Sequence, residues 1–109
     1  MSSSSDFASN LEKLPDTDRY TRMELYAGGI EPAAVIENVD GSRGSFRIYY
    51  AVSRKWGGIG PSAAKEALDL FAEHADDARA NPGKHPNIDR LFSVIENDEY
   101  FSVRCFQRD

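Results

Sequence analysis

The segment SFRIYYAVS, residues 45–53, decides the fold expected for this sequence. Its side chains alternate with a period of two, so that one face carries Phe46, Ile48, Tyr50 and Val52 and the other Arg47, Tyr49 and Ala51. This alternation predicts a β-strand with one face in the core. The stretch DGSRG just before it, residues 40–44, is typical of a tight turn. We therefore expect this strand to run antiparallel to the segment that precedes it.

Strand patterns also occur upstream of this segment and at the end of the chain. Residues 22–27 alternate, with Met23 and Leu25 on one face, and residues 33–39 form a second strand before the turn. Residues 100–106 form a last strand, whose inward side chains are Phe101, Val103 and Cys105. Short connections between the first three strands favour antiparallel neighbours. The sequence thus predicts a four-stranded, mainly antiparallel sheet.

Helical patterns fill the rest of the chain. Asp6 is the predicted N-cap of a short helix that Pro15 ends. Residues 62–80 carry apolar side chains at helical spacing, which predicts one long helix that buries Leu68 and Phe71. A further helix begins near Pro86. The order α-β-β-β-α-α-β predicts an α+β domain whose helices pack on one face of the sheet.

Size and charge limit the classes of protein to consider. The chain has 109 residues, of which 40% are hydrophobic, and a formal net charge of -5. We expect a disordered leader at residues 1–5 and a single domain at residues 6–109. The excess of acidic residues disfavours nucleic-acid binding. No stretch is typical of a membrane span or a signal peptide, so the expected location is the cytoplasm.

Two segments combine residue types that bind anions. The loop at residues 54–60 offers basic, aromatic and glycine residues just before a predicted helix, namely Arg54, Lys55, Trp56, Gly57 and Gly58. The turn at residues 82–90 offers Lys84, His85 and Arg90. Backbone N–H groups at a helix start favour a phosphate or carboxylate. Core packing of the tryptophan and a rigid turn between helices explain the same residues without a ligand. Whether both segments share one pocket is open at this point.

The predicted open face of the sheet is a candidate interaction surface. It carries tyrosine and arginine side chains: Arg22, Tyr26, Arg47, Tyr49, Tyr100 and Arg104. These residue types are enriched at protein interfaces and also stack on bases in RNA-binding sheets. Because the chain is acidic, a solvated face or a homodimer surface is favoured over a ligand platform.

Neither a metal site nor a nucleophile is predicted. His74 and Asp77 lie three residues apart on a predicted helix, and His85 follows, but two histidines in the chain are too few ligands to favour zinc. Cys105 is the single cysteine and faces inward, where a thiol is usually inert. We expect no metal and no cofactor.

Three stretches of the sequence carry a resemblance to a known family. They are PGKHPNIDRLFSVIE at residues 82–96, the overlapping FAEHADDARANPGKHPNID at residues 71–89, and the predicted strand FRIYYAV at residues 46–52. Together they resemble a family of small proteobacterial proteins classified as a domain of unknown function. The resemblance covers most of the chain after the serine-rich start. It implies a free-standing cytosolic protein and brings no known activity or site residue.

The preferred functional hypothesis is a non-enzymatic binding or interaction module that self-associates. A first alternative is an enzyme or sensor that binds a small anionic ligand near residues 54–60 and 82–90. A second alternative is an acidic inhibitor of a basic partner, which would bind through the acidic helix face between Glu66 and Asp77.

Overall fold

Strand β1 (Tyr20–Tyr26) lies at the centre of an antiparallel sheet in the computed structural model, which describes residues 6–108. It pairs on one side with β2 (Ala34–Glu37) and on the other with β3 (Ser102–Gln107). The predicted alternation of β1 is confirmed, because Met23 and Leu25 are fully buried. The predicted leader at residues 1–5 lies outside the described residues.

The predicted third strand at residues 45–53 is wrong. These residues lie within helix α2 (Arg43–Trp56), so the sheet has three strands and not four. The reason is visible in the burial: Ile48, Tyr49 and Tyr50 are consecutive and all buried, whereas a strand would turn every second side chain away from the core. The apolar residues of this segment fit a wide helical face as well as an alternating one, and packing overrides their β-propensity. Gly57, with φ 80°, then ends the helix in the left-handed conformation typical of a C-terminal cap.

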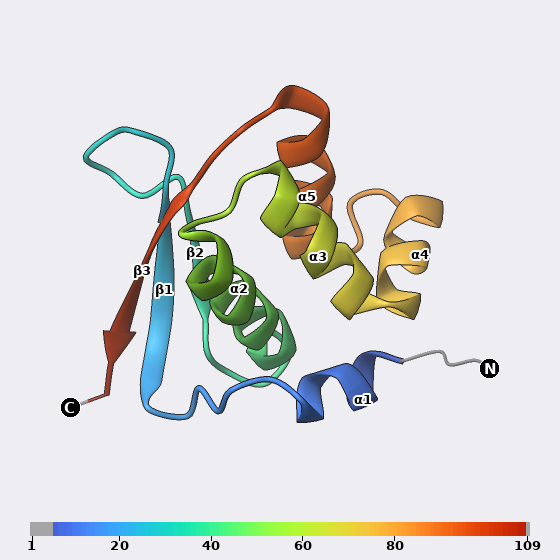
Figure 1. Cartoon of the computed structure of the whole chain (residues 1–109), viewed down its shortest axis with the longest axis horizontal. Coiled ribbons are helices and arrows are strands. Elements are labelled where there is room, and N and C mark those ends of the chain that lie inside the picture. The colour runs from blue at the N-terminus through green and yellow to red at the C-terminus, as the bar shows by residue number, and fades with distance from the viewer. Residues whose placement is uncertain (1–5, 109) are drawn as a thin grey trace.

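The helices lie on one side of the sheet (Figure 1). Helix α2 is next to the strands, and α3 (Pro61–Phe71) and α5 (Pro86–Asn97) pack against each other beyond it. The short helices α1 (Phe7–Glu12) and α4 (Glu73–Ala80) complete this layer. The mixed α+β class and the start of a helix at Pro86 are therefore confirmed. Helix α2 is the centre of the core, since its buried face meets the sheet on one side and α3 on the other.

The helix predicted over residues 62–80 is interrupted. It bends at Ala72, whose φ of 54° and ψ of -121° separate α3 from α4. Such a conformation strains a residue that has a Cβ atom. Phe71 and Leu68 are buried as predicted. The bend directs α4 away from the line of α3, and this places the His74 ring beside the Phe7 ring of α1, with centroids 4.4 Å apart.

Candidate functional site

The loop residues predicted to bind an anion point in two directions. Lys55 and Trp56 lie on the side of α2 that faces α3, where both donate to the same oxygen of Glu66, at 2.8 Å and 3.1 Å. Arg54 points the other way and donates to the hydroxyl of Tyr50 at 3.2 Å. The structure therefore separates Arg54 from its neighbours Lys55 and Trp56.

Arg54 lies at a cavity of about 360 Å³ between the end of α2 and β3, which we call the Arg54 cavity. Its lining consists of Tyr20, Tyr50, Ser53, Arg54, Gly57, Gly58, Val103 and Cys105. Arg19, from the segment before β1, donates to the Tyr50 hydroxyl as well, at 3.1 Å. Two guanidinium groups thus converge on one phenol oxygen. Among residues 6–108, neither arginine forms an ion pair with an acid, and no acid lines this cavity.

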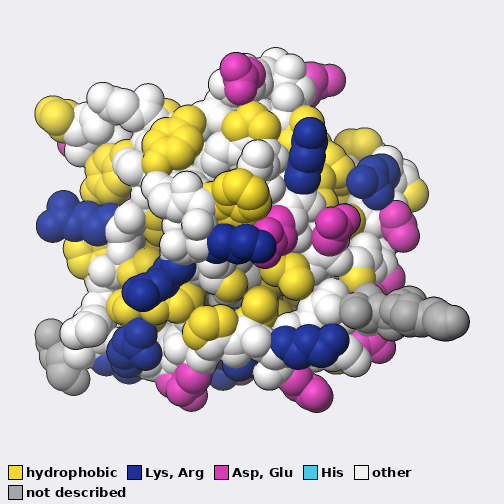
Figure 2. Space-filling view, viewed as in Figure 1, with side chains coloured by type: hydrophobic (Ala, Val, Ile, Leu, Met, Phe, Trp, Pro, Cys, Tyr) yellow, Lys and Arg dark blue, Asp and Glu magenta, His cyan; other side chains and the backbone are white. Residues whose placement is uncertain are grey.

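The charge of the Arg54 cavity follows from these contacts. Each guanidinium has five N–H donors, and the Tyr50 hydroxyl occupies only one from each. The hydrogen bond with Tyr20 raises the pKa of Tyr50, so this hydroxyl keeps its own proton. The C-terminal end of α2 brings about half a negative charge, which the two full positive charges exceed. In Figure 2, basic side chains gather over β3 and the end of α2, and acidic ones lie over the helices and at the margins.

The two glycines contribute less than the sequence indicated. The N–H of Gly57 already donates to the carbonyl of Ser53. The carbonyl of Gly57 accepts from the Tyr100 hydroxyl at 2.6 Å. A Cβ atom at Gly58 would lie 2.1 Å from that hydroxyl, so the glycine is needed for the close approach of the tyrosine. Tyr100 thus holds the loop, and the N–H of Gly57 is already used within α2.

The second predicted group, from the turn at residues 82–90, lies around different partners. His85 Nε2 is 2.6 Å from Asp77 Oδ2, and the Lys84 ammonium is 3.0 Å from the same oxygen. Arg90 donates to the hydroxyl of Tyr49 at 3.1 Å and to Asn87 at 2.9 Å. Arg90 therefore joins α5 to α2 and supports the fold.

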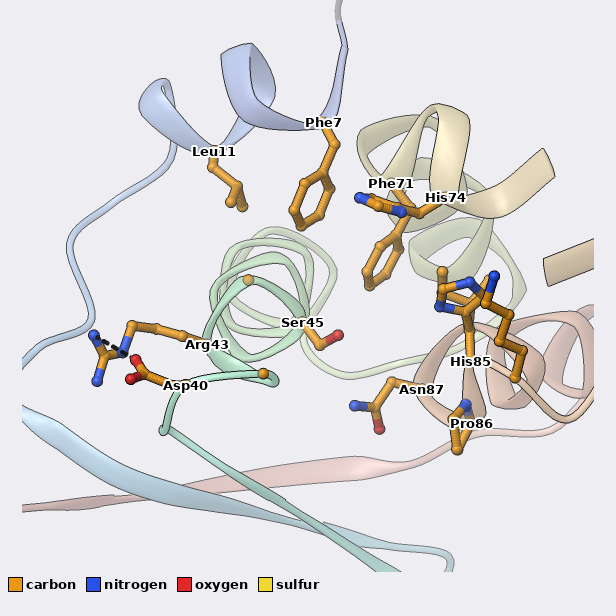
Figure 3. Close-up of a pocket in the computed structure, with 14 residues that line it drawn as sticks. Phe7, Leu11, Asp40, Arg43, Ser45, Phe71, His74, His85, Pro86 and Asn87 are labelled. Carbon is orange, nitrogen blue, oxygen red and sulfur yellow. Dashed lines mark ion pairs between the residues drawn. The ribbon is translucent and has the colours of Figure 1, made fainter. Parts of the chain in front are cut away.

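Lys84 and His85 line a second cavity, of about 470 Å³, which we call the His85 cavity (Figure 3). Its walls come from α1, the start of α2, the α3–α4 bend and the start of α5. The lining consists of Phe7, Leu11, Asp40, Gly41, Arg43, Gly44, Ser45, Phe71, His74, Lys84, His85, Pro86, Asn87 and Ile88. The two predicted segments thus line different cavities, one at each end of α2.

The residues of the predicted interaction surface also lie in different parts of the structure. Arg22, Tyr26 and Arg104 lie on the face of the sheet opposite the helices, as the register of β1 and β3 requires. Tyr49 is fully buried in α2, where burial raises its pKa to about 12. Arg47 donates to the carbonyls of Leu14 and Pro15 and so fastens the segment after α1. The placement of Arg47 and Tyr49 on the open sheet face is therefore wrong, because their segment is helical.

Comparison with known protein families places the chain in a family. Residues 7–105 match the family described as an uncharacterized protein conserved in bacteria (DUF2322). The chain belongs to the DUF2322 family. No curated protein and no solved structure matches it. Within residues 6–108 of this DUF2322 protein, no helix is both long enough and apolar enough to cross a membrane.

Several residues at the cavities of this DUF2322 chain were not identified from the sequence. Tyr20 and Tyr50 line the Arg54 cavity from segments 30 residues apart, and Arg19 reaches the Tyr50 hydroxyl. Ser45 lines the His85 cavity because α2 begins just before it. No local pattern joins these residues, so only the fold brings them together. Among the residues described, no cluster of three or more metal-binding side chains is present.

Proposed function

We propose that the protein binds a small anionic ligand through a phosphate or carboxylate group in the Arg54 cavity. The observation that carries this proposal is the convergence of Arg19 and Arg54 on the Tyr50 hydroxyl without an acid in the lining. Arginine is well suited to such groups, because its planar fork of donors matches two oxygens at once. The donors left for an anion at this place are the remaining N–H groups of the two guanidiniums, since the Ser53 hydroxyl already donates to the carbonyl of Tyr50.

A pair of matched variants tests this proposal. Arg54→Gln and Lys55→Gln each remove one positive charge from the last turn of α2, but only Arg54 lines the cavity. We expect Arg54→Gln to weaken binding of inorganic phosphate or citrate by about tenfold or more, since a hydrogen bond to a charged group contributes about 1.5–3 kcal/mol. Lys55→Gln should leave the affinity nearly unchanged. Calorimetric titration measures the affinity of both variants. The ionic strength is kept constant because the attraction between exposed charges and an anion depends on salt.

Two outcomes would contradict it. Equal losses in the two variants would mean that only the overall positive charge matters, and not the cavity. The second outcome is that neither phosphate, citrate nor any member of a panel of anionic metabolites binds saturably. This would show that the protein does not bind a small anionic ligand. A thermal-shift panel detects binding readily, because a ligand at 100 times its dissociation constant stabilises the fold by about 2.7 kcal/mol.

Self-association through the open face of the sheet is the second candidate function, and a second copy of the chain is its proposed partner. On this face Arg22 lies opposite Glu37 and Glu24 opposite Arg104, so that rows of opposite charge run across the strands. The Arg22 guanidinium stacks over the Phe106 ring, 4.0 Å from its centroid. A face that carries both signs of charge can be complementary to itself about a two-fold axis.

Light scattering coupled to size-exclusion chromatography tests the dimer. A dimer would have about twice the mass of the 12.2 kDa chain. Val35 is 44% exposed on the edge strand of this face, and Val35→Glu should shift the mass towards the monomer because it places a charge in the interface. Ile30→Glu is the control, since Ile30 is 94% exposed in the β1–β2 loop outside the strands. A monomer at every concentration of the unsubstituted chain would overturn this candidate.

A further inference from the structure

The His85 cavity contains a histidine that is oriented by a carboxylate. Asp77 Oδ2 accepts from His85 and Lys84, and Asp77 Oδ1 accepts from Asn81 at 2.9 Å. These hydrogen bonds, that with His85 first, lower the pKa of Asp77 to about 2. Asp77 is therefore a carboxylate near neutral pH, and a carboxylate can only accept hydrogen bonds.

This contact assigns the protons of the His85 ring. Because Asp77 can only accept, Nε2 of His85 carries a proton and donates it across the 2.6 Å contact. In the neutral ring, the other nitrogen, Nδ1, then has a free lone pair. His85 is the N-cap residue of α5, yet its side chain makes no capping hydrogen bond. Within residues 6–108, Nδ1 has no protein donor, so the lone pair is available to a ligand.

The surroundings of this ring indicate what kind of molecule fits. Figure 3 shows His85 rising from the start of α5 towards His74, with the Phe7 and Phe71 rings beside them. The histidine centroids are 5.9 Å apart, and the two phenylalanine rings are stacked at 5.9 Å. Across the cavity, Ser45 and Asn87 add two polar side chains, and their hydroxyl and amide groups can both donate. A cavity of about 470 Å³ with a mainly apolar surface and several polar side chains is typical of a small-molecule site.

We propose that the His85 cavity is a second binding site, for a small neutral molecule that carries an acidic hydroxyl group, a phenol or an enol, on an apolar body. The hydroxyl donates to Nδ1 of His85, and the apolar body lies against Phe7 and Phe71. In the proton transfer that follows, the O–H bond breaks, its electron pair stays on the oxygen and an N–H bond forms at Nδ1. The resulting imidazolium is held by Asp77, and the oxygen anion faces the donors of Ser45 and Asn87.

The charged and titratable groups around His85 allow this transfer. Asp77 and His74 are on α4, and Lys84 lies in the turn between α4 and α5. Across the cavity, Arg43 at the start of α2 forms an ion pair with Asp40 at 3.5 Å. Arg43 is matched by Asp40, whereas Lys84 and the imidazolium share the Asp77 carboxylate. The imidazolium thus forms in direct contact with a carboxylate, which favours the charged ring, and the Lys84 charge opposes this in part.

Binding of 4-nitrophenol to the full chain tests the proposal, because its neutral and ionised forms absorb visible light differently. We expect saturable binding with a shift towards the phenolate spectrum. His85→Asn and Asp77→Asn should each weaken the affinity by about tenfold or more, since a hydrogen bond to a charged group is lost. Asp76→Asn is the matched control: Asp76 is the next residue on α4, pairs with Arg79 on the surface and does not line this cavity.

A spectroscopic measurement separates this role from a purely structural one. Nitrogen chemical shifts of the histidine rings in the unsubstituted chain should show His85 with its proton on Nε2 and an unprotonated Nδ1. A proton on Nδ1 of the neutral ring would overturn the proposal. So would the absence of saturable 4-nitrophenol binding, or binding that survives both the His85 and Asp77 substitutions. That last result would place the probe elsewhere, for example in the Arg54 cavity, and would leave the first proposal standing.

Discussion

Phe71→Ala should lower the free energy of unfolding by about 3–5 kcal/mol, the range found when a buried phenylalanine is truncated. Phe71 is 2% exposed at the end of α3, where its ring stacks on Phe7 and joins α1 to the core. Truncation removes apolar contacts and enlarges the neighbouring His85 cavity, which the surrounding helices cannot fill without moving. Urea denaturation followed by circular dichroism measures the change.

Phe92→Ala is the control for this prediction. Phe92 is only partly buried on α5, and the guanidinium of Arg79 lies 5.1 Å from its ring centroid. The same chemical change should therefore cost less than at Phe71, because part of the ring is already in contact with water. Equal costs at the two positions, or a loss below about 1 kcal/mol at Phe71, would show that α3 does not pack as described.

Asn38→Asp should destabilise the fold by about 2–6 kcal/mol although it changes the side chain by a single group. Asn38 is 2% exposed, and its amide nitrogen donates to the carbonyls of Thr17 and Tyr20, each at 2.9 Å. A carboxylate has no donor, so both carbonyls would lose the Asn38 N–H and face a negative charge, and the Thr17 carbonyl would keep only the N–H of Tyr20. A buried polar group that loses a partner costs about 1–3 kcal/mol, and more where a charge is involved.

The loss at position 38 should depend on pH in a defined direction. Burial beside two carbonyls raises the pKa of the introduced carboxyl group in the folded state above its unfolded value. Stability is then lowest at high pH, and it recovers as the pH falls through the raised folded-state pKa, because protonation restores one donor. Asn97→Asp, at an exposed position at the end of α5, should show a much smaller change. A loss at position 38 that does not respond to pH would contradict this explanation.

The segment at residues 45–53 shows where prediction from sequence failed. Its apolar residues satisfy a period of two and also a broad helical face, and the strand was preferred because of the alternation and the turn pattern at residues 40–44. Two local signals supported the helix: Arg54 and Lys55 fall in its last turn, and Gly57 follows as its cap. The prediction assigned these three residues to a ligand loop instead. The same error placed Arg47 and Tyr49 on the sheet face.

At the candidate sites, some residues could be identified from the neighbouring sequence, and others only from contacts between distant segments. Arg54 and His85 were identified from local composition, because basic residues and histidine beside helix ends are typical of ligand sites. The partner of Arg54 was not, since Tyr50 also receives Arg19 from 31 positions upstream. Asp77 was considered with His85 only as a disfavoured metal ligand, and the two are in contact because the chain reverses between α4 and α5. A hydrogen bond between residues far apart in the chain leaves no periodic trace in the sequence.

The sequence by itself determined the mixed α+β class, the inward faces of β1 and β3, the burial of Phe71 and the start of α5 at Pro86. Each of these follows from side-chain spacing or from a single residue with a strong backbone preference, and such signals act over one or two turns. The tertiary structure alone decided that residues 43–56 are a helix, that the chain bends at Ala72, and that two separate cavities lie at the ends of α2. These features depend on which apolar faces meet in the core. The free energy gained by burying those faces outweighs the small differences in helix or strand propensity within one segment.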